Sequence, residues 1–360
     1  MAESKKPLVS IACGGTGGHF FPGVAVAREL QRQGARVSLW VSSKAIDQKA
    51  AMTVPDLDHH QLPAVGYNWR RPWRFILGMR TAMRRVRDQM KFDKPRAVLA
   101  MGGFTAVAPI LEGRKLGAKT FLHESNAVAG RANRFLSRWV DEVFVGFDQA
   151  KKSFRCKTLL DTGTPVRQKF REVKIEESRR HLGFELDKPL VLILGGSQGA
   201  RGVNRLVTEA LQGMHDLQVL HLSGAQDLDN VRDAYEERQS PSQVHSFFSD
   251  MPCAVGAATL SITRAGASSL AELAAAGVPS IIIPLPGSMD QHQLANAAAV
   301  VESGGGVLIG ERQTSPDELA SIISGIITDE RRCEAMSLSM RQLDRPEAAV
   351  VMAKRIMELM

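Results

Sequence analysis

Two stretches of sequence decide the fold. Residues 8–30 read LVSIACGGTGGHFFPGVAVAREL, and residues 190–211 read LVLILGGSQGARGVNRLVTEAL. Each begins with an apolar run, turns at a Gly-Gly pair and continues with the pattern of an amphipathic helix. Continuous apolar runs of this kind are typical of strands covered on both faces, as in parallel α/β sheets. Because the two turns are half a chain apart, we predict two doubly wound α/β domains.

The length of the chain agrees with two domains. Its 360 residues exceed the size at which single cores stop growing, roughly 250–300 residues. We expect a first domain over residues 1–165, a second over residues 166–342, and a final helix over residues 343–360 that packs back on the first. Ligands of doubly wound sheets bind outside the carboxyl ends of the strands, so we expect the site in a cleft between the domains.

The positive charge is concentrated in one segment. The chain has a net charge of +8, and residues 69–96 contain ten Lys and Arg but only two Asp, which accounts for all of it. Two tryptophans and the run FILGM lie among these arginines. Such a mixture suits an anionic membrane surface. RNA binding is the alternative, but no nucleic-acid motif accompanies the segment, so we expect no nucleic-acid partner.

The cysteines and the apolar segments argue against several classes of protein. The four cysteines are far apart and form no CxxC pair, so their spacing indicates neither a zinc site nor a disulfide framework, and it fits a reducing cytosol. The longest uncharged stretch, LAAAGVPSIIIPLPGSM, is interrupted by prolines, and we expect no membrane span.

The turn GGTGGH at residues 14–19 predicts an anion-binding helix start. It does not match the dinucleotide pattern GxGxxG, and no acidic residue follows the next apolar run, RVSLWVSS, to hold a ribose. The turn GGSQGAR at residues 195–201 is similar, with Ser197 and Gln198 as further donors near a helix N-terminus. For both turns the alternative is a tight strand-to-helix connection without a ligand.

Three later motifs place polar residues after apolar runs. In TRAGASSLAELAAAGVPSIIIP (residues 263–284), a helix should begin near Ser268, and Glu272 either completes a capping box with Ser269 or binds the hydroxyls of a ribose. In DQHQLANA (residues 290–297), clustered amides suit a ligand with many hydroxyls. In HESNAVAGRANR (residues 123–134), His123 is a site residue or a hydrogen-bonded structural histidine.

In combination these motifs resemble the MurG family, bacterial glycosyltransferases of family 28 that add N-acetylglucosamine to lipid I. The resemblance covers essentially the whole chain and rests on GGTGGHFFPGVAVA, GGFTAVAP, HESNAVAGRANR, GTPVR, GGSQGAR, RAGASSLAELAAAGVPSIIIP and DQHQLANA, in this order. It implies the GT-B fold, with two Rossmann-like domains facing a cleft. It also implies that the first domain binds the lipid acceptor and that the second binds most of UDP-N-acetylglucosamine (UDP-GlcNAc).

The resemblance assigns residues to these substrates. Phe248 would offer backbone groups to the uracil, Glu272 would hold the ribose, and Gln293 would hold the sugar hydroxyls. The family's sugar-nucleotide contacts fall on Thr16, Gly17, Gly18, Asn126, Arg167, Ser197, Phe248, Ala267, Ser268, Ser269, Leu270, Ala271, Glu272 and Gln293. The chain departs from the family at Phe104, Ser125 and Thr164, where tyrosine, glutamine and asparagine are usual.

The implied reaction is an inverting displacement in which the C4 hydroxyl of N-acetylmuramic acid attacks the anomeric carbon of the donor. The nucleophile must lose a proton, and histidine has a suitable unperturbed pKa. We predict His19 as the base, with His123 as the second candidate. Helix N-termini and Arg167 suit the leaving diphosphate, so the sequence requires no cofactor, although a divalent cation is compatible with it.

The expected partners are UDP-GlcNAc, lipid I, an anionic membrane surface bound through residues 69–96, and the cell-wall synthesis machinery. The expected location is peripheral, on the cytoplasmic face of the cell membrane, in peptidoglycan synthesis linked to cell shape and division. Two alternatives are another GT-B enzyme that uses a UDP-sugar, namely a glycolipid synthase or an epimerase, and a non-catalytic UDP-sugar sensor.

Overall fold

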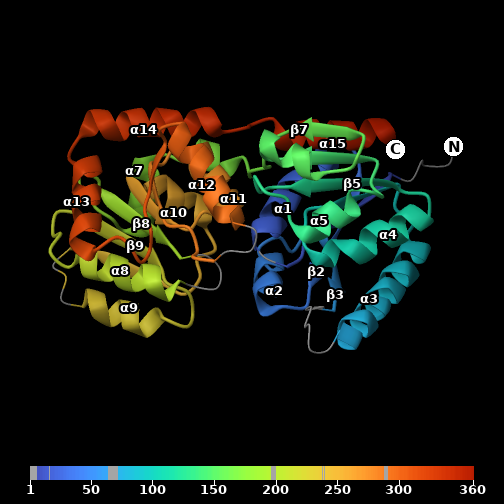
Figure 1. The fold of residues 1–360 in the computed structure, drawn as a ribbon, viewed down its shortest axis with the longest axis horizontal. Helices are drawn as coiled ribbons and strands as arrows, with labels where there is room; N and C mark the ends of the chain where they lie inside the picture. The colour runs from blue at the N-terminus through green and yellow to red at the C-terminus, as the bar shows by residue number, and fades with distance from the viewer. Residues whose placement is uncertain are drawn as a thin grey trace. The chain divides into compact units, whose positions relative to one another are not determined.

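In the computed structural model, the chain folds into two compact units (Figure 1). The first comprises Met1–Arg167 and Arg345–Met360, and the second comprises Gln168–Asp344. The residues described are 6–360 except Thr16, 64–71, 196–199, Glu237, Gln239 and 288–290, and the side chains of Ile46, Pro72, Arg74 and Phe75 are also not described.

The first unit is built on a seven-stranded sheet in which every neighbouring pair is parallel. Its order is β3-β2-β1-β4-β5-β6-β7. The strands are β1 (Leu8–Ala12), β2 (Arg36–Ser42), β3 (Asp58–Leu62), β4 (Ala97–Ala100), β5 (Lys119–Glu124), β6 (Glu142–Val145) and β7 (Thr158–Asp161). The order reverses between β1 and β4, and ligands of such sheets bind outside the carboxyl ends of the strands at that point.

Helices cover both faces of this sheet. They are α1 (Gly17–Arg32), α2 (Ala45–Ala51), α3 (Pro72–Phe92), α4 (Val107–Lys115), α5 (Arg131–Leu136) and α15 (Ala348–Leu359), with the 3-10 turns η1 (Phe104–Ala106) and η2 (Asp148–Ser153). One core packs Val9 and Leu39 against residues of α1 and α15, and the other packs Trp40 and Val98 against residues of α3 and α4. Because successive strand residues point to opposite faces and both faces are buried, the strands appear as continuous apolar runs.

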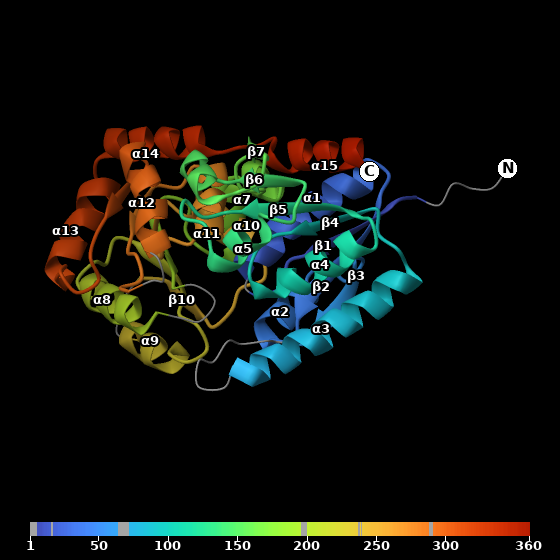
Figure 2. The same ribbon diagram turned by 45° about the vertical axis from the view of Figure 1, so that its right-hand side comes forward.

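The last helix of the chain, α15, belongs to the first unit. It packs on α1, as Figure 2 shows, and its residues Met352, Ala353 and Ile356 are fully buried in the first core. Arg355 adds an ion pair with the buried carboxylate of Glu142 at the start of β6.

The second unit repeats this plan with a six-stranded parallel sheet of order β10-β9-β8-β11-β12-β13. The strands are β8 (Leu190–Leu194), β9 (Gln218–Leu222), β10 (Ser242–His245), β11 (Leu260–Thr263), β12 (Ser280–Ile282) and β13 (Gly306–Leu308). The helices are α6 (Lys169–Glu172), α7 (Ile175–Leu182), α8 (Arg201–Leu211), α9 (Leu228–Tyr235), α10 (Met251–Ala257), α11 (Ala267–Ala276), α12 (His292–Glu302), α13 (Pro316–Ile327) and α14 (Glu330–Leu343). The order reverses between β8 and β11, so the predicted fold class, two doubly wound parallel sheets, is confirmed.

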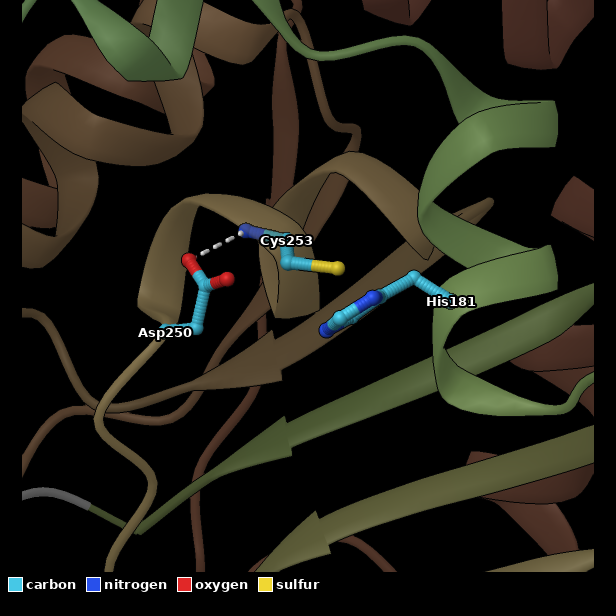
Figure 3. Close-up of side chains that lie close together, drawn as sticks. All are labelled: His181, Asp250 and Cys253. Carbon is cyan, nitrogen blue, oxygen red and sulfur yellow. Dashed lines mark hydrogen bonds between the residues drawn. The ribbon is translucent and has the colours of Figure 1, made fainter.

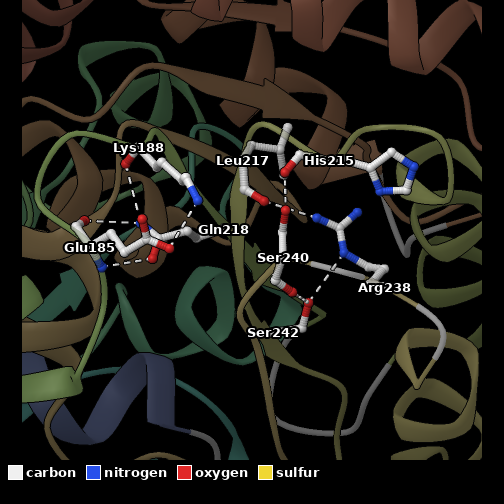
Figure 4. Close-up of polar contacts among 8 residues, drawn as sticks. All are labelled: Glu185, Lys188, His215, Leu217, Gln218, Arg238, Ser240 and Ser242. Carbon is white, nitrogen blue, oxygen red and sulfur yellow. Dashed lines mark hydrogen bonds and ion pairs between the residues drawn. The ribbon is translucent and has the colours of Figure 1, made fainter.

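Side chains fasten the amino-terminal ends of two strands in the second sheet (Figure 4). The fully buried Gln218, which begins β9, accepts a hydrogen bond from the Glu185 N–H at 2.8 Å and donates to the Glu185 and Lys188 carbonyls. Arg238 donates to the Leu217 carbonyl at 2.9 Å and to Ser242 Oγ, at the start of β10, at 3.2 Å. These contacts hold the starts of β9 and β10 in place, at the end of the sheet opposite the carboxyl ends of its strands.

Within the described residues, no helix is both long enough and apolar enough to cross a membrane.

Candidate functional site

The first candidate site lies where the strand order of the first unit reverses. The turns after β1 and β4 meet there, because Thr105 Oγ1 donates a hydrogen bond to the Gly14 carbonyl at 2.6 Å. The His19 imidazole packs on the second turn. A Cβ added at Gly102 would lie 2.9 Å from its Nε2, and one at Gly103 would lie 3.4 Å from its Cε1. Both positions also have positive φ, +118° and +76°. This second turn, formed by Gly102, Gly103 and Phe104 and called the GGF turn below, therefore needs glycine both for its backbone conformation and to leave space for the imidazole.

A buried carboxylate holds the first turn. The Gly15 N–H donates to Asp47 Oδ2 at 2.6 Å, and the Ser42 hydroxyl donates to the same oxygen. Asp47 is fully buried in the first turn of α2. We expected no acidic residue after this strand to hold a ribose. Asp47 follows it by five residues, and its charge is directed to the protein's own backbone.

A second buried carboxylate, Glu124 at the end of β5, organises the neighbouring loop. It accepts hydrogen bonds from the backbone N–H groups of Asn126 and Gly130, both at 2.9 Å, and from the side-chain amides of Asn126 and Asn133, at 2.9 and 2.8 Å. Asn126, a predicted substrate contact, is thereby oriented by Glu124. Glu124 lies within the motif HESNAVAGRANR, but no role was predicted for it. The glycine and the two asparagines of HESNAVAGRANR, which donate these hydrogen bonds, were the sequence signal that could have indicated this role of Glu124.

The two candidate bases differ in their surroundings. His123 is fully buried, and its Nε2 and Nδ1 lie 3.2 Å from the Gly163 carbonyl and 3.4 Å from Ser125 Oγ. Burial lowers the pKa of His123 to about 4. His19 is only half-buried. Desolvation lowers its pKa, while the Glu124 and Asp47 carboxylates act in the opposite direction. Both imidazoles are therefore neutral at neutral pH, and His19 is the more accessible of the two.

Arg167 lies beside the start of α1. Its guanidinium carbon is 4.2 Å from the centroid of the Phe21 ring, and a Cβ added at Gly17 would be 3.8 Å from that ring. Arg167, Gly17 and Gly18 therefore occupy one region of the first unit. Thr16, the remaining predicted contact in this turn, lies outside the described residues.

The second candidate site is the helix start after β11, where the second sheet reverses its order. Helix α11 begins at Ala267 with Gly266 as its N-cap, and among the described residues no side chain caps it. Of the two alternatives for Glu272, the capping box with Ser269 does not form, because α11 begins at Ala267 and contains both residues. Ala267 and Leu270 are buried, whereas Ser268, Ser269, Ala271 and Glu272 are half-buried.

Arg264 connects the loops at this end of the sheet, although it was not among the predicted site residues. Its buried guanidinium donates to the Ile283 and Pro284 carbonyls after β12, at 3.1 and 3.2 Å, and pairs with Glu311 after β13. Asn296 on α12 donates to the Ala265 carbonyl at 3.0 Å. Nothing in the local sequence indicates these long-range contacts.

The other predicted donor contacts of this unit lie in the first turn of α12 and in the loop before α10. Gln293 Oε1 accepts from the Leu285 N–H at 2.8 Å, which fixes the orientation of its side chain. Gln291, just before α12, has φ of +53°, and such strain in a non-glycine residue is often found at binding sites. The Phe248 ring packs against that of His245 with centroids 5.1 Å apart. Ser197 lies outside the described residues.

The basic segment forms the amphipathic helix α3 of the first unit. Trp73, Ile76 and Leu77 are each about half exposed, at 54%, 51% and 53%. A small apolar hollow connects this helix to the GGF turn. It is lined by Leu62, Pro63, Met79, Ala82, Phe104, Thr105 and Ala108.

Comparisons with known proteins agree with this geometry. Residues 9–145 match the glycosyltransferase family 28 N-terminal domain, and residues 190–352 match the glycosyltransferase family 28 C-terminal domain. Two curated relatives are named UDP-N-acetylglucosamine–N-acetylmuramyl-(pentapeptide) pyrophosphoryl-undecaprenol N-acetylglucosamine transferase. The one from Listeria welshimeri is 33% identical over 98% of this chain and 99% of its own. The one from Allorhizobium ampelinum is 33% identical over 97% of this chain and 94% of its own.

Solved structures point the same way. UDP-GlcNAc 2-epimerase from Neisseria meningitidis has a TM-score of 0.71 over 98% of this chain and all of its own, but at 12% identity that likeness shows the fold alone. The crystal structure of Acinetobacter baumannii MurG has a TM-score of 0.74 and 28% identity, and the match covers 98% of this chain and 99% of that one. The chain therefore belongs to the MurG family of glycosyltransferases, glycosyltransferase family 28.

Proposed function

We propose that this chain transfers N-acetylglucosamine from UDP-GlcNAc to the C4 hydroxyl of N-acetylmuramic acid in lipid I, which yields lipid II. The curated relatives carry this reaction in their names, and they align with nearly the whole chain. The observation that carries the proposal is the meeting of two glycine turns around His19 at the point where the first sheet reverses its order.

The first unit takes the acceptor in this proposal. Glycine turns leave backbone N–H groups accessible, and a helix N-terminus attracts the negative charge of a diphosphate. The half-buried, neutral imidazole of His19 lies between the two turns, within reach of a sugar attached to that diphosphate. His19 takes the proton of the C4 hydroxyl as that oxygen bonds to the anomeric carbon, and UDP departs with the electrons of the broken bond. His123 keeps a structural role, because its ring is buried and bound to the Gly163 carbonyl.

The second unit takes the donor. The first turn of α11 offers backbone N–H groups to the diphosphate, where the helix dipole favours negative charge. Glu272, in the second turn of the same helix, binds the ribose hydroxyls, and Gln293 binds hydroxyls of the sugar. Phe248 receives the uracil, and Ser197 assists at the diphosphate. Arg167 stabilises the charge that grows on the leaving diphosphate.

The lipid part of the acceptor determines where in the cell the protein acts. The apolar hollow beside Phe104 leads from the GGF turn to α3, and suits the first isoprene units of the lipid. The exposed Trp73, Ile76 and Leu77 enter the headgroup region, while arginines of α3 contact anionic lipids. The protein is thus placed peripherally on the cytoplasmic face of the cell membrane, beside the machinery of cell-wall synthesis, cell shape and division. Phe104 contributes to lipid binding and takes no part in proton transfer, because its ring has no hydroxyl.

Transfer of labelled N-acetylglucosamine from UDP to a short-chain lipid I analogue tests the activity. We expect a labelled disaccharide lipid whose new bond is β, because a single displacement inverts the α configuration of the donor. Release of free N-acetylmannosamine and UDP without a labelled lipid would identify an epimerase. UDP-GlcNAc binding without either product would identify a sensor. Each of these outcomes would contradict the proposal.

A further inference from the structure

A group of three metal-ligating side chains lies in the second unit, apart from the residues assigned above. His181 is in the last turn of α7, Asp250 directly precedes α10, and Cys253 is in the first turn of α10. One ligand atom from each residue lies within 4.8 Å of the others. Figure 3 shows the imidazole, the carboxylate and the sulfur converging on the same space between the two helices.

We propose that His181, Asp250 and Cys253 form a binding site for Zn²⁺ or a similar transition-metal ion. Imidazole nitrogen, thiolate sulfur and carboxylate oxygen are the donors that zinc prefers, and magnesium and calcium prefer oxygen alone. Three protein ligands leave the fourth tetrahedral position open to water. This site is additional to the transferase function and does not depend on it.

The backbone around the site is firmly held. Helices α7 and α10 pack so closely that a Cβ added at Gly256 would lie 2.7 Å from Ser178 Oγ. Asp250 caps α10 by accepting the Cys253 N–H at 3.4 Å, and Cys253 Sγ lies 3.7 Å from the Ser178 carbonyl. The positions from which the three ligands project are therefore fixed, so binding a metal requires little ordering of the chain.

The side chains need only small rotations to coordinate a metal. Zinc lies about 2.0–2.3 Å from its ligands, so two tetrahedral ligands are roughly 3.3–3.8 Å apart. No separation here exceeds 4.8 Å, so the ligand atoms must approach one another by roughly 1.5 Å at most. His181 and Asp250 are exposed, so rotation of their side chains can supply this closure without moving the helices.

The charge balance also favours a cation. A thiol that coordinates a divalent cation gives up its proton, so the Cys253 thiolate and the Asp250 carboxylate together neutralise the charge of the ion. The dispersed cysteines gave no sign of this site, because its ligands come together only in the fold.

Cobalt titration of the full-length protein tests the proposal. The protein is treated with a chelator, kept reduced with a phosphine, and titrated with Co²⁺, which replaces Zn²⁺ and gives a near-ultraviolet charge-transfer band when a thiolate binds it. We expect a saturable, equimolar band that Zn²⁺ abolishes, and a melting temperature that rises with Zn²⁺ concentration. Absence of a saturable band in the wild-type protein would overturn the proposal.

Matched variants identify the ligands. Cys253→Ser should abolish the band, and His181→Asn, at an exposed position, should weaken cobalt binding by about tenfold or more. Cys333→Ser and His215→Asn change a half-buried cysteine and an exposed histidine of the same unit, and should leave binding unchanged. A band that persists in Cys253→Ser, or that disappears in Cys333→Ser, would refute the assignment. The melting temperature without metal shows that each variant is folded.

Discussion

His19 is the residue whose replacement should affect the reaction most. His19→Ala should lower kcat by about 10²–10⁴-fold, the usual contribution of a general base. Desolvation lowers the pKa of His19 below the ordinary value of a histidine, so the imidazole stays neutral at neutral pH. In the wild-type protein, kcat/KM should therefore fall only when the pH drops through this lowered pKa. A profile of kcat/KM against pH with the lipid I analogue measures both effects, and a variant that raises only the acceptor KM would make His19 a binding residue.

Asp47 offers a check on that profile. Its carboxylate raises the pKa of His19, so Asp47→Asn should shift the acidic limb of kcat/KM to lower pH. Asp56→Asn removes an exposed carboxylate that pairs with Arg28, and should leave the limb in place. Equal shifts in the two variants would mean that the net charge of the protein, and not the nearby Asp47 carboxylate, is responsible.

His123 should affect stability more than catalysis. Its pKa is about 4 in the folded protein and near 6.5 when unfolded, so the unfolded chain binds the proton more tightly. The stabilising contribution of the neutral ring is complete above pH 6.5 and is lost as the pH falls toward 4. His123→Gln should make the melting temperature less sensitive to pH in that window, while kcat at neutral pH stays within a few-fold of wild type. Identical pH dependence in both proteins would contradict this account.

Among the elements, α11 offers a test of donor binding. Glu272 lies inside α11 and not at its N-cap, so Glu272→Ala should leave the start of the helix intact. Loss of hydrogen bonds to a charged group costs about 1.5–3 kcal/mol, so the KM for UDP-GlcNAc should rise roughly 10–100-fold. Kinetics with varied donor and thermal melting measure the two effects. Glu302→Ala, at the exposed end of α12, is the control, and an unchanged donor KM would remove Glu272 from the site.

Helix α3 should bind anionic membranes through its exposed arginines. Arg80, Arg84 and Arg85 are exposed, whereas Arg87 pairs with the buried Glu112 of α4 at 2.9 Å and must be kept for stability. Each basic residue contributes about 1 kcal/mol near such a surface, so changing the three exposed arginines to Glu should reduce vesicle binding at least tenfold in low salt. Co-sedimentation with vesicles that contain anionic phospholipid measures this.

The same change of net charge at residues outside α3 is the control for that helix. Arg312, Arg331 and Lys354 are exposed, and their replacement by Glu should leave vesicle binding close to wild type. If both triple variants lost binding equally, overall charge and not α3 would explain the attraction.

The elements also show what the sequence could and could not predict. The strands, the glycine turn after β1 and the doubly wound sheets follow from local patterns, because a strand buried on both faces needs a continuous apolar run. The contacts of Asp47 with Gly15 and of Arg264 with Glu311 join residues 32 and 47 positions apart, and no local pattern encodes them. The capping-box alternative for Ser269 and Glu272 fails for a local reason, since α11 follows Gly266 and begins earlier than the capping pattern indicates.

At the scale of the whole molecule, the first unit is built from two separate parts of the chain, one before and one after the second unit. Helix α15 follows the entire second unit and completes the core of the first. The stability of the first unit therefore depends on the last residues of the chain. All four tryptophans, at positions 40, 69, 73 and 139, belong to the first unit, so tryptophan fluorescence reports the unfolding of that unit alone.

This arrangement allows the two units to be tested separately with a matched pair of variants. Ile356 on α15 and Ile326 on α13 are both fully buried, in the core of the first and of the second unit, respectively. Each Ile→Ala change should destabilise its own unit by about 2–5 kcal/mol. In urea unfolding, Ile356→Ala should lower the midpoint of tryptophan fluorescence, whereas Ile326→Ala should leave that midpoint unchanged and lower only the circular dichroism transition of the second unit. If Ile326→Ala lowered the fluorescence midpoint by the same amount, the two units would unfold together, and the separate contribution of α15 to the first unit would be contradicted.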